Sequence, residues 1–309
     1  MKLCLLSASF AAMLVLASAC APTAPEAPVA PEAPLAPAAA AIPYGANQPA
    51  SGTFTHDGVT FYYETYGQGD PLLLIHGNGA SLGSMAAQID FFKARYKVIA
   101  MDSREQGKSG SSDAPINYEV MADDLAALLD HLKTGPADIV GWSDGGIEGL
   151  LLAMRHPDKV KKLVAMAANL NPSLEAIYPE TEAMAKAIPG SIPEEVKDTP
   201  DGKRFLKVTG LLLSEPHIDP KSLAKITAPT LIVSSDHDVI RLEHTVTIFN
   251  NLPNANLAVL PNNTHMVPFD DPELFNATVQ RFLDTPFVRK DRINDMAASG
   301  EKMMATLPH

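Results

Sequence analysis

The chain has 309 residues, 46% of them hydrophobic, which is enough for one large domain or two ordinary domains with a substantial core. Its formal net charge of -12 argues against partners such as nucleic acid and against electrostatic docking on anionic lipid. Both cysteines, Cys4 and Cys20, lie in the first 20 residues, so disulfide bonds are excluded in the rest of the chain.

The first 20 residues are typical of an export signal. A lysine at position 2 is followed by an apolar stretch that ends in the small residues Ala17-Ser18-Ala19. These residues fit an ordinary cleavage site, and small residues directly before Cys20 also resemble a bacterial lipobox. We expect an exported bacterial protein with lipidation at Cys20, and a periplasmic or secreted form is the alternative. The membrane would then be contacted only through the lipid.

Residues 21–50 follow the signal and are rich in alanine and proline, with almost no charge. A segment of this composition stays extended and builds no core. We therefore expect a tether between the membrane and a folded domain at 51–285.

The folded domain shows strands that alternate with helices. A β-hairpin is predicted from residues 53–55 and 59–66, joined at Asp57-Gly58. A helix is predicted at 118–132, with Asn117 as its N-cap. Further strands are expected at 71–75, 97–101, 137–141, 161–167, 229–234 and 256–260. This alternation predicts an α/β fold with a mostly parallel, doubly wound sheet.

One segment, residues 171–228, interrupts this alternation. It has helix-like patches, several prolines and no convincing strand, so we expect a small helical cap, with a disordered surface loop as the alternative. Met184 and the leucines at 211–213 would supply apolar surface over a pocket. The tail at 286–309 is polar and rich in methionine, and we expect a final helix or a frayed end there.

The stretch Gly141-Trp142-Ser143-Asp144-Gly145 has the pattern G-x-S-x-G and lies between an apolar run and a helix-like one. On a strand–turn–helix this pattern forms a nucleophile elbow, which holds the serine hydroxyl in the open. The turn is so tight that side chains two residues before and after the serine would collide with the backbone, which accounts for Gly141 and Gly145. Ser143 is therefore the candidate nucleophile.

The other parts of a serine hydrolase follow in the required chain order. The strand at 71–75 runs into a His-Gly-Asn-Gly turn, which offers the backbone N–H of Asn78, together with that of Asp144, as an oxyanion hole. Asp236 and Asp238 both follow the strand at 229–234 as candidate acids. His265 follows the next strand as the general base, because neutral imidazole suits proton transfer at neutral pH.

With these residues in place, residues 52–283 resemble the α/β-hydrolase superfamily. The resemblance favours Asp238 as the acid, because it directly precedes the hydrophobic pair Val239-Ile240. The stretch around Ser143 is similar to the biphenyl hydrolase-like (valacyclovir hydrolase) branch, which cleaves esters of α-amino acids. There, an aspartate after the nucleophile is implicated in holding the substrate's amino group, which implies this role for Asp144.

The segment at 101–109 resembles the family's D-x-R-G-x-G-x-S, except that Glu105 stands where glycine is usual, so a different loop shape is expected there. A serine nucleophile also excludes the aspartate-based mechanism of haloalkane dehalogenases and epoxide hydrolases.

The sequence thus predicts a serine hydrolase acting on small carboxylic esters, a subset of which carry an α-amino group. Trp142 and Met266, the neighbours of the nucleophile and the base, are expected to contact this small-molecule substrate. No cofactor is expected and no metal, since H-E-x-x-H and C-x-x-C spacings are absent. A lactonase, a C–C bond hydrolase, a cofactor-free haloperoxidase and a non-catalytic binding protein remain alternatives. No feature specifies an oligomeric state.

Overall fold

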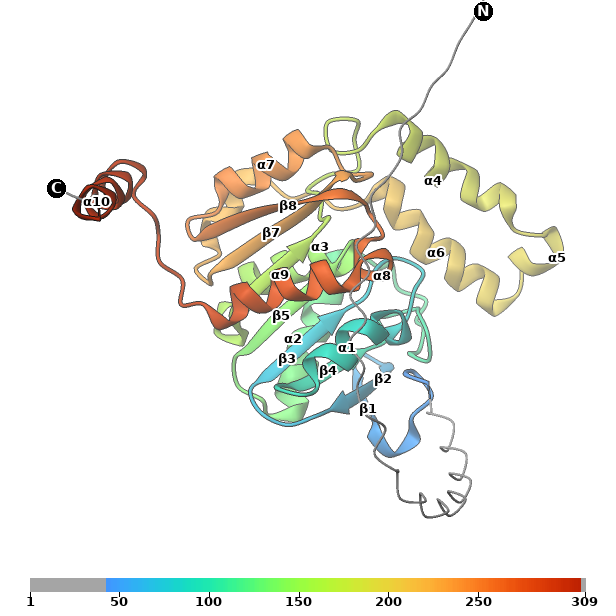
Figure 1. Ribbon diagram of the computed structural model, residues 1–309. Coiled ribbons are helices and arrows are strands. Elements are labelled where there is room, and N and C mark those ends of the chain that lie inside the picture. Colours follow the sequence, from blue (N-terminus) through green and yellow to red (C-terminus); the bar gives the residue numbers. More distant parts are fainter. Residues whose placement is uncertain (1–42, 307–309) are drawn as a thin grey trace, which may run out of the picture. The chain divides into compact units, whose positions relative to one another are not determined.

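The computed structural model describes residues 43–306, so the predicted signal, Cys20 and most of the predicted tether lie outside the described residues. One sheet of eight strands, in the order β1-β2-β4-β3-β5-β6-β7-β8, forms the centre of the domain (Figure 1). β1 and β2 form an antiparallel pair, β2 is antiparallel to β4, and all later neighbours are parallel. The α/β fold with a mostly parallel sheet and an N-terminal hairpin, predicted from the sequence, is confirmed. The strands are β1 (Ser51–His56), β2 (Val59–Tyr66), β3 (Pro71–Ile75), β4 (Lys97–Met101), β5 (Ala137–Trp142), β6 (Val160–Met166), β7 (Thr230–His237) and β8 (Ala255–Thr264).

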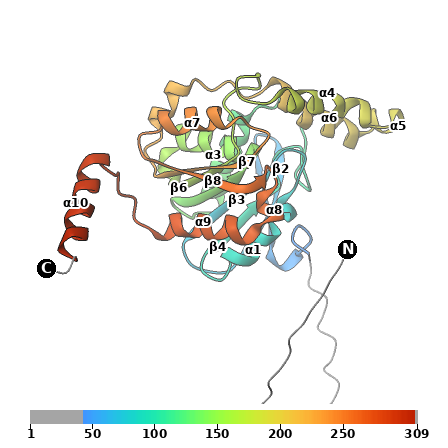
Figure 2. The ribbon, with the colours of Figure 1, turned by 45° about the horizontal axis from the view of Figure 1, so that its top comes forward.

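The central strands are apolar runs because helices cover both faces of the sheet. One core lies against α2 (Tyr118–Leu132), α3 (Asp144–Arg155) and α7 (Leu242–Asn251). The other lies against α1 (Ala86–Phe92), α8 (Val267–Asp270) and α9 (Pro272–Asp284). Figure 2 shows α1 and α9 on the opposite side of the sheet from α3 and α7. The carboxyl ends of the parallel strands remain open between these two layers, which is where ligands bind in such sheets.

The structure confirms two local predictions, the hairpin turn at Asp57-Gly58 and the helix N-cap at Asn117. The hairpin turn at Asp57-Gly58 has positive φ angles of 46° and 74°, the conformation that two-residue hairpin turns favour. α2 begins after Asn117, whose side chain accepts a hydrogen bond of 2.9 Å from the backbone N–H of Val120.

The segment at 171–228 is largely helical. It contains α4 (Pro179–Ser191), the short α5 (Glu194–Lys197), α6 (Pro200–Ser214) and a 3-10 turn at Pro220–Lys225. α4 and α6 lie beside each other in both ribbon views (Figures 1 and 2). Of the three leucines predicted to face the pocket, Leu211 is buried in the core and Leu213 is exposed, so the run does not act as one surface.

Glu105 joins the cap to the sheet domain. Its carboxylate is buried, lies 2.7 Å from Lys207 Nζ of α6 and accepts a hydrogen bond of 3.0 Å from the backbone N–H of Ser112. Arg204 of α6 donates to the backbone carbonyls of Glu105 and Ser109 at 3.2 and 2.7 Å. Glu105 has a φ of 66°, a left-handed conformation that glycine adopts more easily. The side chain that replaces the usual glycine therefore anchors α6.

The described chain before β1 is already attached to the domain. The backbone N–H groups of Gly45 and Asn47 donate to the buried carboxylate of Glu64 at 2.8 and 2.9 Å. The folded part thus starts earlier than residue 51, where the sequence placed it. At the other end, the tail forms α10 (Arg292–Ala305), which has no buried residue in the described range. No helix among the described residues is long and apolar enough to span a membrane.

Candidate active site

Ser143 lies at the sharp turn between β5 and α3, with φ 58° and ψ -118°. This conformation is strained for a residue with a side chain. The flanking glycines make it possible: a Cβ on Gly141 would lie 2.0 Å from the Gly145 carbonyl oxygen, and one on Gly145 would lie 2.3 Å from the Ile75 oxygen. The local backbone is therefore that of a nucleophile elbow.

His265 connects the serine to an acid. Its Nε2 lies 2.9 Å from Ser143 Oγ, and its Nδ1 lies 2.7 Å from Asp238 Oδ1. An ionised Asp238 accepts the Nδ1 proton, which leaves Nε2 free to accept the serine proton. Trp142 Nε1 donates to the backbone oxygen of His265 at 2.8 Å and so fixes the loop that carries the base.

The structure separates the two candidate acids. Asp238 is buried behind His265, and the backbone N–H of Ile240 donates to its Oδ1 at 3.1 Å. Asp236 is exposed and accepts from the backbone N–H groups of Asn262 and Asn263 at 2.8 and 3.1 Å. These contacts give Asp238 the geometry of the triad acid, whereas Asp236 links the end of β7 to the end of the neighbouring strand β8.

The loop after β3, residues 76–80, forms the other wall of the site and is called the oxyanion loop below. Burial lowers the pKa of His76, whose Nε2 accepts from the Ser103 N–H at 3.0 Å and whose Nδ1 lies 2.8 Å from the Gly77 oxygen. The N–H of Asn78 has no acceptor within residues 43–306, and an N–H in the first turn of a helix, such as that of Asp144, has no intrahelical acceptor. Both are available for an oxyanion.

Asp144 follows the nucleophile and is buried, with 2% of its surface exposed. Its Oδ2 accepts from Asn78 Nδ2 at 2.9 Å, so the oxyanion loop and α3 are joined by these two side chains. Burial raises the pKa of Asp144 to about 6, although hydrogen bonds from Asn78 and Tyr118 act in the opposite direction. At a pH near 6, the carboxyl group beside the nucleophile is therefore present in both its protonated and its ionised form.

Glu148 lies one turn further along α3 and is also buried. Neither of its carboxylate oxygens has a hydrogen-bond partner among the described residues. Burial raises the pKa of Glu148 well above its usual range, and the nearby carboxylates of Asp144 and Asp124 raise it further. Glu148 therefore keeps its proton to a higher pH in the folded chain than in the unfolded chain.

This state predicts a specific pH dependence of stability. The raised pKa means that the folded chain holds a proton on Glu148 that the unfolded chain releases above its ordinary pKa, so the free energy of unfolding falls as pH rises above about 5, at up to about 1.4 kcal/mol per pH unit for one proton. Glu148→Gln is expected to remove this fall and to be more stable than the natural chain at pH 8. Urea unfolding at pH 5 and 8 measures it, with the exposed Glu175→Gln as the control. Parallel pH profiles for both variants and the natural chain would show that Glu148 is ionised.

A cavity of about 470 Å³, called the active-site cavity below, contains Ser143 and His265. Trp142 and Met266 line it, as predicted from the sequence, and so do Met184 and Leu212 of the cap. Its walls are mostly apolar, and the titratable residues among them, apart from His265, are Tyr118, Asp144 and Glu215. Within the described chain no lysine or arginine lines the cavity, so its charges favour neutral or cationic substrates.

Two lining residues were missed at the sequence level. Tyr118 follows the N-cap of α2, and burial raises the pKa of its hydroxyl well above the usual range. Glu215 follows the last residue of α6, and burial raises its pKa as well. Nothing in their local sequence distinguishes them, because both reach the cavity only through the packing of α2 and α6.

Comparisons with known proteins agree with this architecture. A family model described as alpha/beta hydrolase fold matches residues 70–189. A Caulobacter protein, provisionally named carbamate hydrolase RutD, is 30% identical over 74% of this chain and 97% of its own length. Serine hydrolase BPHL of the mouse is 27% identical over 74% of this chain and 84% of its own.

Two further relatives match only part of their length. A second RutD, from Azorhizobium caulinodans, and 3-oxoadipate enol-lactonase 2 from Acinetobacter baylyi are 37% and 35% identical over 36% of this chain. The chain covers 42% and 43% of these two relatives.

Among solved structures, MGS-M2, an alpha/beta hydrolase enzyme from a deep-sea metagenome library, superposes with a TM-score of 0.68 at 22% identity, over 78% of this chain and all of that one. At this identity the likeness concerns the fold. The similarity to the Caulobacter protein extends over nearly all of that relative. The chain therefore belongs to the alpha/beta hydrolase family.

Proposed function

We propose that this protein hydrolyses small carboxylic esters through an acyl-enzyme intermediate on Ser143. The observation that carries the proposal is the position of His265, whose two ring nitrogens lie within hydrogen-bond distance of Ser143 and Asp238. A serine hydroxyl is a weak nucleophile on its own, and a base at this distance activates it.

The reaction follows from this arrangement. Ser143 Oγ attacks the ester carbonyl carbon while His265 Nε2 takes the hydroxyl proton, and the backbone N–H groups of Asn78 and Asp144 hold the resulting oxyanion. His265 then gives its proton to the departing alcohol oxygen as the C–O bond breaks. A water molecule, activated by the same nitrogen, attacks the acyl-enzyme and releases the acid and the free serine. Asp238 orients the imidazole and stabilises its cationic form.

We further propose that Asp144 selects esters with an α-amino group. The support is its place directly after the nucleophile, as in the biphenyl hydrolase-like branch, together with its burial at the edge of a cavity that no lysine or arginine of residues 43–306 lines. A buried carboxylate binds an ammonium group more strongly than an exposed one does. The competing role for Asp144 is that of an acidic residue in the first turn of α3, where the helix dipole favours it.

Asp144→Asn separates these roles. We expect kcat/KM for phenylalanine ethyl ester to fall by about 10- to 100-fold, the effect of one charge-assisted hydrogen bond, and kcat/KM for ethyl 3-phenylpropanoate to change much less. Asparagine keeps the acceptor for Asn78 and loses only the charge.

The same pair of substrates tests the pH dependence. Between about pH 5 and 7, where the substrate's amino group is still mostly cationic, the ratio of kcat/KM for the amino ester to that for its desamino analogue is expected to rise with pH, because the pKa of Asp144 is about 6 and only the ionised carboxylate attracts the ammonium group. In the Asn variant the ratio should be flat. Equal rates for both esters in the natural protein at every pH would show that Asp144 does not bind the amino group of the substrate.

Cyclic esters are a second candidate class, and the name of one relative, an enol-lactonase, favours them. The chemistry is the same, except that the leaving alcohol stays attached to the acyl group. Assays on γ-butyrolactone and on an open ester of equal size distinguish the two classes.

A further inference from the structure

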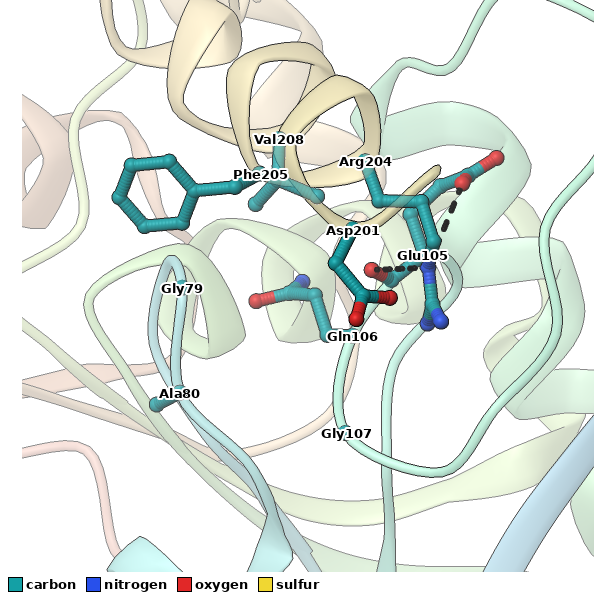
Figure 3. Close-up of a pocket in the computed structure, with 9 residues that line it drawn as sticks. All are labelled: Gly79, Ala80, Glu105, Gln106, Gly107, Asp201, Arg204, Phe205 and Val208. Atoms are coloured by element: carbon teal, nitrogen blue, oxygen red, sulfur yellow. Dashed lines mark hydrogen bonds and ion pairs between the residues drawn. The ribbon is translucent and has the colours of Figure 1, made fainter. Parts of the chain in front are cut away.

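A second, smaller cavity of about 180 Å³ shares lining residues with the active-site cavity. Figure 3 shows the residues that line it. It is enclosed by Gly79 and Ala80 of the oxyanion loop, by the loop at 105–107 and by the first turns of α6. Gly79 and Phe205 line both cavities, so these two residues form the partition between them. Phe205 is 42% exposed, and its Cε2 lies 3.9 Å from the position that a Cβ on Gly79 would occupy. The two spaces therefore adjoin at an exposed ring and at a residue without a side chain.

Gln106 lies at this partition with an unused amide. The residue is 5% exposed, and neither Nε2 nor Oε1 has a hydrogen-bond partner within residues 43–306. Figure 3 shows its side chain extending towards the space between Gly79 and Phe205. A buried amide without partners costs stability, and native proteins rarely keep one without a functional reason. The side chain offers one donor and one acceptor next to each other.

The charges around this cavity do not favour an anionic ligand. Arg204 is the positive side chain of its lining, and its Nε and Nη2 already donate to backbone carbonyls. The carboxylates of Glu105 and Asp201 line the same space. A neutral group is therefore favoured, and the complement of an amide is a group that also carries a donor beside an acceptor, namely a primary carboxamide or a urea.

We propose that Gln106 forms a subsite that binds a neutral carboxamide or ureido group at the far end of the substrate. The substrate would then span the partition, with its scissile carbonyl at Ser143 and its polar end at Gln106. Rotation of the Phe205 ring opens the passage over Gly79. The inference rests on the proposed esterase function and extends it by a specificity-determining residue.

The kinetic test uses matched esters. p-Nitrophenyl 6-amino-6-oxohexanoate carries a terminal carboxamide, and p-nitrophenyl 6-oxoheptanoate has a methyl group in place of the NH2. A second pair, the acetates of 6-hydroxyhexanamide and 7-hydroxyheptan-2-one, places the same groups on the alcohol side. We expect the natural enzyme to prefer the amide in at least one pair by about tenfold in kcat/KM, the effect of one or two hydrogen bonds.

Gln106→Met is the deciding variant, because methionine fills a similar volume without polar atoms. The preference should disappear in Gln106→Met and persist in the matched control Gln68→Met, an exposed position in the turn before β3. The melting temperature of Gln106→Met should not fall, since no hydrogen bond is lost. If the amide preference is equal in the natural enzyme and Gln106→Met, or absent in both pairs of esters, the subsite is overturned.

A binding measurement separates this inference from the esterase proposal. In Ser143→Ala protein, the side-chain NH2 resonances of Gln106, identified by their absence in Gln106→Met, should shift saturably with hexanamide and not with heptan-2-one. A shift together with no hydrolysis of any ester would support the subsite and contradict the esterase. Ester hydrolysis that depends on Ser143, without a shift and without a kinetic preference, would contradict the subsite alone.

Discussion

Ser143→Ala is expected to lower ester turnover by at least about three orders of magnitude. The substitution removes the nucleophile 2.9 Å from His265 Nε2, while the oxyanion loop and the cavity stay in place. The residual rate would come from binding and from the oxyanion donors alone. Alanine meets the same backbone conformation as serine at this turn, so the fold should persist.

The measurement is the hydrolysis of p-nitrophenyl butyrate, with circular dichroism to verify folding and the exposed Ser299→Ala as the control. A serine-directed fluorophosphonate should label the natural protein and the Ser299 variant, and it should leave Ser143→Ala unlabelled. Full activity in Ser143→Ala would end the esterase proposal. Absence of labelling in the natural protein would favour a binding protein on the same fold.

Asp238→Asn is expected to reduce kcat by about 10³- to 10⁴-fold. The Asp238 carboxylate accepts the Nδ1 proton of His265 at 2.7 Å, and an asparagine amide in its place favours the wrong tautomer of the imidazole. His265 Nε2 would then carry the proton and could not accept one from Ser143.

Asp236→Asn supplies a closely matched control, because it makes the same chemical change two residues away, within β7 rather than just after it. Asp236 is exposed and accepts hydrogen bonds from two backbone N–H groups of β8, those of Asn262 and Asn263, one of which asparagine still satisfies. Its kcat should stay within severalfold of the natural value. The reverse ranking of the two variants would assign the acid to Asp236.

Much of the fold was predictable, because the strands of a parallel sheet are short apolar runs. The predicted strand at 71–75 coincides with β3, and the hairpin and α2 form where their turn and cap residues indicated. The elbow was predictable because its two glycines are required by the local geometry. A Cβ at Gly141 or Gly145 would lie only 2.0 or 2.3 Å from a backbone oxygen, so no residue with a side chain fits there.

The choice between Asp236 and Asp238 was less accessible from the residues themselves. Strand β7 continues to His237, beyond the predicted end at 234, and both aspartates lie at its end. Which one faces His265 depends on the irregular pairing of β7 with β8 after Ser235. The burial of Glu148 and Gln106 was equally hidden, because it arises where α2, α3 and α6 pack against loops distant in the sequence.

The two long helices of the cap, α4 and α6, are attached to the sheet domain by unequal numbers of interactions, which affects how substrates enter the cavity. Displacing α6 would break the ion pair of Lys207 with Glu105 and the two hydrogen bonds of Arg204. Displacing α4 would expose a single buried residue of that helix, Ala185, and break the hydrogen bond from Thr181 to the Val239 oxygen. Opening the cavity by moving α4 therefore breaks fewer interactions than moving α6. We expect the position of α4 to set the size limit for substrates, while α6 stays in place.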